Sequence, residues 1–263
     1  MRRLVAIDIG NTRYHAALYE WQDAAPDDTL QLLPLNPRQP IWHGQDLDEF
    51  PLGALPAEPT WWFTVSVHRL REEKWHEWLT RARPADSVHR LTGQQMQVPL
   101  AVEHPERVGL DRLAAARTAL ERRTDGQPVI LVDIGTAVTV DYVDEAGVFR
   151  GGAIFPGVRA AADALHWATD ALPRLQTLPA EPPALPGPHT QGAISAGVYY
   201  GVRGAVVELV GQLVARAPAR PLVLVGGDCG FVEPLARWHA EWVPDLVLRG
   251  VALAGRRWLE EHF

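Results

Sequence analysis

The sequence predicts an α/β protein made of two related halves, each built on a mixed β-sheet. The prediction depends on two similar segments, Asp8-Ile9-Gly10-Asn11-Thr12 and Asp133-Ile134-Gly135-Thr136. Each follows a short apolar run typical of a buried strand, Leu4–Ile7 in the first half and Val129–Val132 in the second. Asp followed by Gly and a hydroxyl residue predicts a tight turn whose exposed backbone N–H groups can hold a phosphate. Two such turns, about half the chain apart, indicate two half-molecules around one nucleotide.

The elements of the first half follow from hydrophobic spacing and turn residues. Short apolar runs predict strands, while the Pro-, Asp- and Gln-rich residues 22–40 predict a loop. Trp75 and Trp78 supply the apolar side of an otherwise charged helix, and alanine-rich spacing predicts a second helix that ends at Asp125-Gly126. The predicted order is strand Leu4–Ile9, strand Tyr14–Trp21, strand Trp61–Val65, helix Arg69–Arg83, strand Ser87–Leu91 and helix Gly109–Arg123.

The second half repeats the opening pattern, so the halves are taken as domains of residues 1–124 and 125–263. A strand meander follows the second Asp-x-Gly segment, and many prolines make residues 173–189 irregular. Thr190 is expected to cap a long helix. The predicted order is strands Val129–Asp133, Val138–Val143 and Val148–Ile154, a helix from Pro156 to Thr169, a helix from Thr190 to Ala215, strand Leu222–Val225 and two short helical segments.

The composition is that of a globular protein without a nucleic-acid-binding surface. The 263 residues are 47% hydrophobic and 22% charged, with a formal net charge of −7. That negative charge, with arginines scattered along the chain, argues against nucleic-acid binding. The apolar run after Arg2 and Arg3 stops at Asp8, which is too short for a signal peptide, and no later stretch is expected to span a membrane. The single Cys229 excludes an internal disulfide, which fits a reducing cytoplasm.

Lysine is almost absent, which removes several phosphate-binding designs. Lys74 is the only lysine among the 25 Lys and Arg residues, and it lies in Glu73-Lys74-Trp75 rather than in Gly-Lys-Ser/Thr. A Walker A loop and the strand lysine of protein kinases are therefore excluded. The Gly-x-Gly-x-x-Gly dinucleotide motif, His-Glu-x-x-His and Gly-x-Ser-x-Gly are missing too. Aspartates, threonines, glycines and arginines remain as the groups that can carry chemistry.

The repeated order of strand, hairpin, strand and helix, beginning each time with Asp-x-Gly, resembles the duplicated ribonuclease-H-like architecture of the actin, Hsp70 and sugar-kinase superfamily. The resemblance implies an actin-like ATPase fold with mixed sheets. In that superfamily the two Asp-x-Gly turns hold the ATP phosphates, and a later Gly-Gly segment lies beside the adenosine. Gly226-Gly227-Asp228 would take that last role here.

Further segments narrow the resemblance to one family. Besides the two Asp-x-Gly turns, the chain has Gly109-Leu110-Asp111-Arg112, the glycine-rich turn Gly151–Gly157 and Thr190 at the start of the long helix. In this order they resemble the type III pantothenate kinases, also called the Bvg accessory factor-like family. The resemblance extends over nearly the whole chain.

That resemblance implies a role for each segment. Asp8 would help hold the magnesium of ATP, Thr136 would contact ATP, and Asp133 would bind a monovalent cation, potassium or ammonium. Asp111 would be the general base, and Thr190 would reach pantothenate across a dimer interface. The first phosphate loop would comprise Asp8, Ile9, Gly10, Asn11, Thr12, Arg13, Tyr14 and His15. The pantothenate site would comprise Gly109, Leu110, Asp111 and Arg112, with the Arg112 guanidinium suited to the substrate carboxylate.

The implied activity is ATP-dependent phosphorylation of pantothenate to 4'-phosphopantothenate, the first step of coenzyme A biosynthesis, by a cytoplasmic homodimer. One alternative is a non-catalytic nucleotide-binding accessory protein of the same family, and the intact carboxylates argue against it. Another is a sugar or acetate kinase of the same superfamily, and the segment Gly109–Arg112 argues against that. Two positions depart from the family pattern, because Val102 replaces a frequent tyrosine and Phe155 replaces a smaller residue.

Local chemistry leaves a structural role open for several of these residues. Asp111 is also a common first-turn helix carboxylate, Arg112 a surface ion-pair former and Thr190 a plain helix cap. Asp141 fits a metal-proximal carboxylate or a structural role at a strand end equally well. The tryptophans are expected mostly in the core or at interfaces, with Trp61-Trp62 packing on the helix that carries Trp75 and Trp78. The histidines without metal-ligand spacing are His15, His104, His166 and His189.

Overall fold

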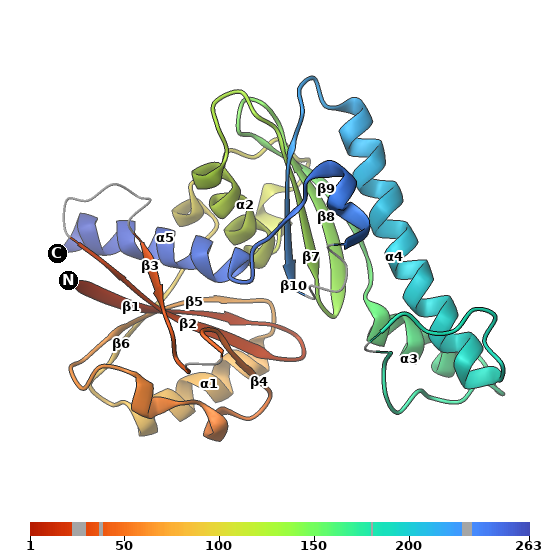
Figure 1. Cartoon of the computed structure of the whole chain (residues 1–263). Coiled ribbons are helices and arrows are strands. Elements are labelled where there is room, and N and C mark those ends of the chain that lie inside the picture. The colour runs from red at the N-terminus through yellow and green to blue at the C-terminus, as the bar shows by residue number, and fades with distance from the viewer. Residues whose placement is uncertain (23–29, 37–38, 180, 228–232) are drawn as a thin grey trace. The chain divides into compact units, whose positions relative to one another are not determined.

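The computed structural model describes residues 1–22, 30–36, 39–179, 181–227 and 233–263 (Figure 1). The chain forms two compact units. Unit 1 is Met1–Thr124 with Gly147–Phe149 and Pro244–Phe263, and unit 2 is Asp125–Ala146 with Arg150–Val243. The first crossing between them, after Thr124, lies where the sequence places its domain boundary. The last segment, Pro244–Phe263, differs from that expectation because it packs in unit 1.

Unit 1 is built on a mixed sheet in the order β3-β2-β1-β5-β6, with β4 also paired to β2. β1 and β2 are antiparallel and joined by the first Asp-x-Gly turn, whereas β5 runs parallel to β1 and β6 runs parallel to β5. The strands are β1 Arg2–Ile9, β2 Tyr14–Trp21, β3 Gln31–Leu33, β4 Trp42–Gly44, β5 Trp61–Ser66 and β6 Ser87–Arg90.

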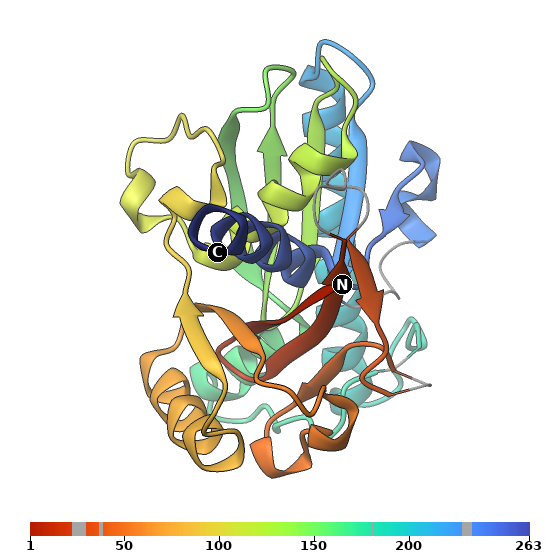
Figure 2. The same ribbon diagram turned by 90° about the vertical axis from the view of Figure 1, so that its left-hand side faces the viewer.

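Helices cover both faces of this sheet (Figures 1 and 2). The helices of unit 1 are α1 Arg69–Ala82, α2 Leu110–Arg122 and α5 Leu246–His262. α1 packs on one face, where the rings of Trp62 and Trp75 lie 5.9 Å apart in the core that also contains Val5 and Ile7. This confirms the predicted packing for Trp62, whereas the Trp61 ring lies 5.1 Å from that of Trp258 on α5. α5 packs on the other face and against α2, where Thr118 donates to Leu246 O at 2.7 Å.

Two elements of unit 1 differ from the sequence expectation. Strand β3 lies inside residues 22–40, which were expected to form only a loop; residues 23–29 and 37–38 of that stretch lie outside the described residues. The chain also ends in one helix of 17 residues, α5, rather than in a short helical segment. Gly250 lies within α5, where a Cβ would be only 1.8 Å from Ala114 O on α2. Because glycine has no Cβ, α5 and α2 can approach closely at this position, and the helix continues through it.

Unit 2 contains a sheet with the same plan, in the order β11-β10-β7-β8-β9. β7 and β8 form an antiparallel hairpin around the second Asp-x-Gly turn, and β10 runs parallel to β7 as β5 does to β1. This repeated topology confirms the predicted duplicated α/β fold with mixed sheets. The strands are β7 Val129–Ile134, β8 Ala137–Val143, β9 Phe149–Pro156, β10 Leu222–Gly227 and β11 Glu241–Trp242.

The helices of unit 2 are α3 Val158–Ala168 and α4 Thr190–Arg216. Short 3-10 helices complete the chain at Leu47–Glu49, Leu52–Ala54, Gln94–Met96, Pro105–Arg107 and Glu233–Trp238. α4 lies along the sheet in Figure 1, and Val202, Val206 and Val210 pack on its strands. By length and composition alone α4 could cross a membrane, contrary to the sequence expectation, but its buried side belongs to the core of unit 2.

The helix cap of α4 also differs from the prediction. His189 is the N-cap residue, and its Nδ1 accepts a hydrogen bond from Gly192 N–H at 3.1 Å. Thr190 is the first helical residue. The ring nitrogen of His189 therefore does the capping that the sequence assigned to the Thr190 hydroxyl.

Candidate active site

The predicted first phosphate loop is the turn between β1 and β2. Ile9 pairs with Tyr14, and Gly10 N–H donates to Arg13 O at 3.0 Å, which closes the turn. The exposed residues of the turn are Asn11, Thr12 and Arg13. The turn therefore begins two residues after Asp8, at the end of β1, and its tip is exposed.

Asp8 has one carboxylate oxygen with a partner and one without. Its Oδ2 lies 3.4 Å from Nδ1 of His15, the residue opposite it on β2. Its Oδ1 is buried and has no hydrogen-bond partner. A buried carboxylate oxygen without a partner is costly, so this atom fits a bound cation or a water ligand of one.

Tyr14 points away from the turn into the core of unit 1. Its side chain is buried, and its hydroxyl donates to Arg71 O at 3.1 Å. The Arg71 guanidinium carbon lies 4.1 Å from the centre of the Tyr14 ring. A contact between Tyr14 and a nucleotide would therefore have to use its backbone.

Asp111 lies in the first turn of α2, as predicted, and its Oδ1 accepts a hydrogen bond from Arg112 N–H at 2.8 Å. Burial raises the pKa of the Asp111 carboxyl above its ordinary value, and the negative charge of Asp8 raises it further. The hydrogen bond from Arg112 N–H and the Arg112 charge act in the opposite direction. The effect of Asp8 on Asp111 means that the two carboxylates occupy one electrostatic neighbourhood of unit 1.

The other residues of this segment surround the start of α2. Gly109 is the N-cap residue and has no side chain to cap the helix, while Asp111 Oδ1 accepts from Arg112 N–H at this end. The positive end of the helix dipole still favours an anion here. Leu110 is the first helical residue. The Arg112 guanidinium carbon lies 5.4 Å from the centre of the Phe149 ring. Sequence reasoning missed Phe149, because an apolar residue at the start of a strand carries no signal for its long-range contact.

The second turn lies between β7 and β8, with Asp133 on β7 in register with Gly226 on β10. Gly135 N–H donates to Ala137 O at 3.1 Å, which closes a turn shorter than the first. Thr136 is exposed at its tip, and its carbonyl oxygen accepts from Gly157 N–H at 2.9 Å. The glycine-rich segment that ends β9 therefore contacts the second turn directly.

The predicted adenosine segment also adjoins this turn. Gly227 is in register with Ile134 and has φ +71°, and a Cβ at Gly227 would lie 2.2 Å from Ile134 O. Only glycine fits both the left-handed backbone and this close approach. Gly226 and Gly227 thus lie beside the second turn within unit 2, while Asp228 and Cys229 lie outside the described residues.

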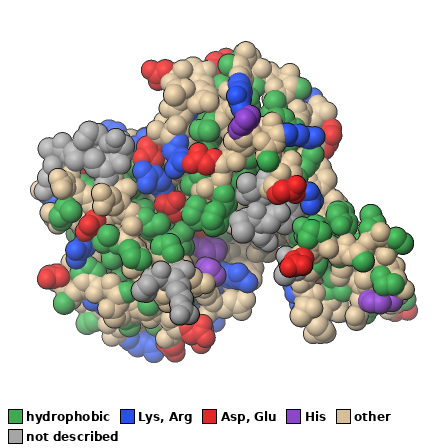
Figure 3. Space-filling view, in the orientation of Figure 1, with side chains coloured by type: hydrophobic (Ala, Val, Ile, Leu, Met, Phe, Trp, Pro, Cys, Tyr) green, Lys and Arg blue, Asp and Glu red, His purple; other side chains and the backbone are tan. Residues whose placement is uncertain are grey.

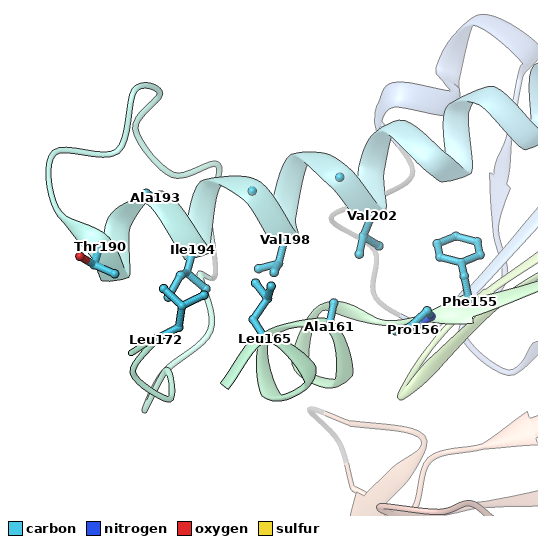
Figure 4. A pocket seen from close by; sticks show the side chains of 12 residues that line it. Phe155, Pro156, Ala161, Leu165, Leu172, Thr190, Ala193, Ile194, Val198 and Val202 are labelled. Carbon is cyan, nitrogen blue, oxygen red and sulfur yellow. The ribbon is translucent and has the colours of Figure 1, made fainter. Parts of the chain in front are cut away.

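Thr190 lies in a different part of unit 2, at one end of an apolar pocket of about 580 Å³ (Figure 4). Figure 4 shows the side chains of α4 facing those of α3 across it, with Phe155 and Pro156 from β9 at the other end. The predicted site residues therefore form three groups. Asp8 lies with Asp111 in unit 1. Asp133 lies with Thr136 and the Gly226-Gly227 segment in unit 2, and Thr190 lies in the pocket. Asp141 is buried at 1% exposure on β8.

Comparison with known proteins decides the family. A family model described as type III pantothenate kinase matches residues 4–212. The chain belongs to the type III pantothenate kinase family. A type III pantothenate kinase of Alkalilimnicola ehrlichii is 33% identical over 97% of this chain and 99% of its own length. The chain is therefore an enzyme of a kinase family.

Solved structures agree on the fold. A protein described as a Baf family transcriptional activator from Campylobacter jejuni aligns with a TM-score of 0.54 at 20% identity, over 98% of this chain and 100% of that one. A protein assigned as a 2-dehydro-3-deoxygalactonokinase from Sinorhizobium meliloti aligns with a TM-score of 0.53 at 12% identity, over 97% of this chain and 98% of that one. At such identity the likeness is one of fold, the actin-like ATPase fold that also occurs in sugar kinases.

Proposed function

We propose that the chain transfers the terminal phosphate of ATP to the primary hydroxyl of pantothenate, giving 4'-phosphopantothenate for coenzyme A biosynthesis in the cytoplasm. Family membership supports the reaction and both substrates. One structural observation supports the division of roles most directly: Asp8 and Asp111, one with an orphaned oxygen and one with a raised pKa, lie in one electrostatic neighbourhood. Two carboxylates in different environments suit two different tasks.

Asp111 is the general base in this proposal. Phosphoryl transfer gains mostly from positioning and charge neutralisation, and a carboxylate can accept the proton of the attacking hydroxyl. The raised pKa makes Asp111 a stronger base than an exposed aspartate. The positive dipole end of α2 and the Arg112 guanidinium bind the carboxylate of pantothenate beside it.

The two turns hold the phosphates of ATP. Backbone N–H groups near Asn11 and Thr136 donate to phosphate oxygens, and the Gly226-Gly227 segment lies beside the adenosine. This design needs no lysine, in keeping with a chain that has only one.

Magnesium and a monovalent cation fit separate residues. Asp8, with its buried unpartnered Oδ1, would hold the magnesium of ATP, which supplies charge neutralisation on the phosphates. Asp133 would hold potassium or ammonium. Across the residues described by the structure, no group of three or more His, Cys, Asp or Glu side chains could bind a metal.

The active form is a homodimer in which Thr190 reaches the pantothenate of the partner subunit. The support is the apolar pocket that Thr190 lines and the hydrophobic side chains that gather over the same end of unit 2 (Figure 3). Leu165 and Trp167 of α3 are 37% and 75% exposed, and a second copy would cover such a surface.

One assay tests this function. Pantothenate-dependent ATP consumption is measured with and without potassium, on the unsubstituted chain and on Asp111→Asn. We expect turnover that requires pantothenate, rises with potassium and is almost lost in Asp111→Asn. Absence of turnover in any salt would refute the kinase proposal, and undiminished turnover of Asp111→Asn would refute Asp111 as the base.

A further inference from the structure

Trp242 lies beside the proposed adenosine segment but has no role in the function described above. It is on β11, which runs parallel to β10, and it is in register with Val225, the residue before Gly226. Val243 N–H donates to Val225 O at 2.8 Å, which fixes the end of β11 against β10. Because parallel strands end at the same edge of a sheet, Trp242 lies at the edge where Gly226 and Gly227 end β10.

The indole of Trp242 is oriented by this edge and remains exposed. Its Nε1–H donates to Gly227 O at 3.4 Å, so the ring is held over the backbone of the glycine segment. The residue is nevertheless 47% exposed. Among the described residues, no aromatic ring or guanidinium stacks on the Trp242 indole. The ring therefore presents an open apolar face next to Gly227.

We propose that Trp242 stacks on the purine base of the bound nucleotide and contributes to its affinity. The inference rests on the proposed function, which lays the adenosine along Gly226 and Gly227. An indole has a large flat face, and bases stack on such faces readily. The hydrogen bond to Gly227 O restricts the ring before the nucleotide binds, so little side-chain freedom is lost on binding. The phosphate turns recognise no base, and Trp242 is the group that distinguishes a nucleoside triphosphate from inorganic triphosphate.

The test compares Trp242→Ala and Trp242→Phe with Leu70→Ala, which removes an exposed hydrophobic side chain of α1 in unit 1. The KM for ATP and the KM for pantothenate are measured separately, and inorganic tripolyphosphate is tested as a phosphate donor. We expect the KM for ATP to rise about tenfold in Trp242→Ala, because a loss of affinity of this size is typical when the aromatic partner of one stacked base is removed. Trp242→Phe retains a ring and should lose much less. The KM for pantothenate and the use of tripolyphosphate should stay unchanged in both variants.

Direct binding separates this inference from the proposed function. Adenosine, which has no phosphates, is titrated into the unsubstituted chain and into each variant by calorimetry, with thermal unfolding as the check on folding. Weaker adenosine binding in Trp242→Ala, but not in Leu70→Ala, supports base stacking. If the unsubstituted chain turns over ATP and pantothenate while Trp242→Ala keeps its KM for ATP and its affinity for adenosine, base stacking is refuted and the kinase function stands. If the unsubstituted chain has no kinase activity, the proposed function is refuted, and with it the adenosine site on which this inference rests.

Discussion

Asp111 illustrates how much a single residue depends on its surroundings. In the sequence it is one of many helix-start carboxylates, and only its place in an ordered set of motifs distinguishes it. In the structure, burial and the nearby charge of Asp8 raise its pKa. The folded protein therefore binds a proton at Asp111 more tightly than the unfolded chain does. This tighter proton binding stabilises the folded state fully below the ordinary aspartate pKa, and the stabilisation is lost as pH rises through the raised pKa.

Asp111→Asn should therefore have opposite effects on activity and stability. Loss of a general base typically costs about 100-fold to 10,000-fold in rate. At pH 7 the variant should melt at a higher temperature than the unsubstituted chain, because no charge has to be held in the buried site. That difference should vanish below the ordinary aspartate pKa. Calorimetric melting across pH checks this, with the exposed Asp170→Asn as control; an unchanged melting temperature at pH 7 would contradict the electrostatic account.

Gly227 gives a second prediction for a single residue. Gly227→Ala places a Cβ 2.2 Å from Ile134 O at a φ of +71° and should cost about 2 kcal/mol or more in the free energy of unfolding. Gly126 has a similar φ of +74° but no heavy atom within 4 Å of its Cβ position. Gly126→Ala should therefore lose only about 1 kcal/mol in the free energy of unfolding, the cost of holding a residue with a Cβ in the left-handed conformation. Urea unfolding of both variants measures the difference, and equal losses would show that close approach to the second turn is unimportant.

Individual elements show where local pattern predicts structure and where it does not. The strand and turn at each Asp-x-Gly segment were predicted correctly because apolar runs, turn residues and spacing are all local. β3 was missed because it is short and lies among loop-forming residues, and its pairing with β2 supplies the stability. α5 was predicted too short, and its length goes with its packing against α2, where Gly250 lies close to Ala114.

The ion pair between α5 and α2 should hold these elements together. Arg249 donates to Glu121 through Nε at 2.7 Å, and the two side chains are only 15% and 10% exposed. Arg249→Met leaves Glu121 buried without its partner, which typically costs about 3–5 kcal/mol. Arg257→Met breaks the exposed pair with Glu261 and should change stability by less than about 0.5 kcal/mol. Denaturant titration of the two variants compares them, and similar effects would argue against a stabilising role for the buried pair.

At the scale of the whole molecule, the proposed dimer makes each active site depend on two chains. Asp111 belongs to unit 1 and Thr190 to unit 2, and the proposal has them serve the same pantothenate from different subunits. Thr190→Glu introduces a negative charge that repels the substrate carboxylate. Its activity should therefore be lost, as should that of Asp111→Asn.

Mixing the two inactive variants tests this arrangement. After subunit exchange at equal concentrations, half of the dimers combine both chains, and each of these has one intact site. We expect about a quarter of the unsubstituted activity to return, as for sites shared between symmetric subunits. If both residues served the same site from one chain, mixing would restore nothing. Size-exclusion chromatography of each variant alone verifies that dimers persist.

The sequence by itself determined the duplicated α/β plan, the two Asp-x-Gly turns and the family, because these depend on short runs and on motif order along the chain. The tertiary structure decided that Pro244–Phe263 belongs to unit 1, that His189 caps α4, and that Asp8 and Asp111 interact. It also decided that Trp242 lies against Gly227. Each of these outcomes depends on contacts between residues distant in sequence, and the burial and close approach that create them leave no local pattern.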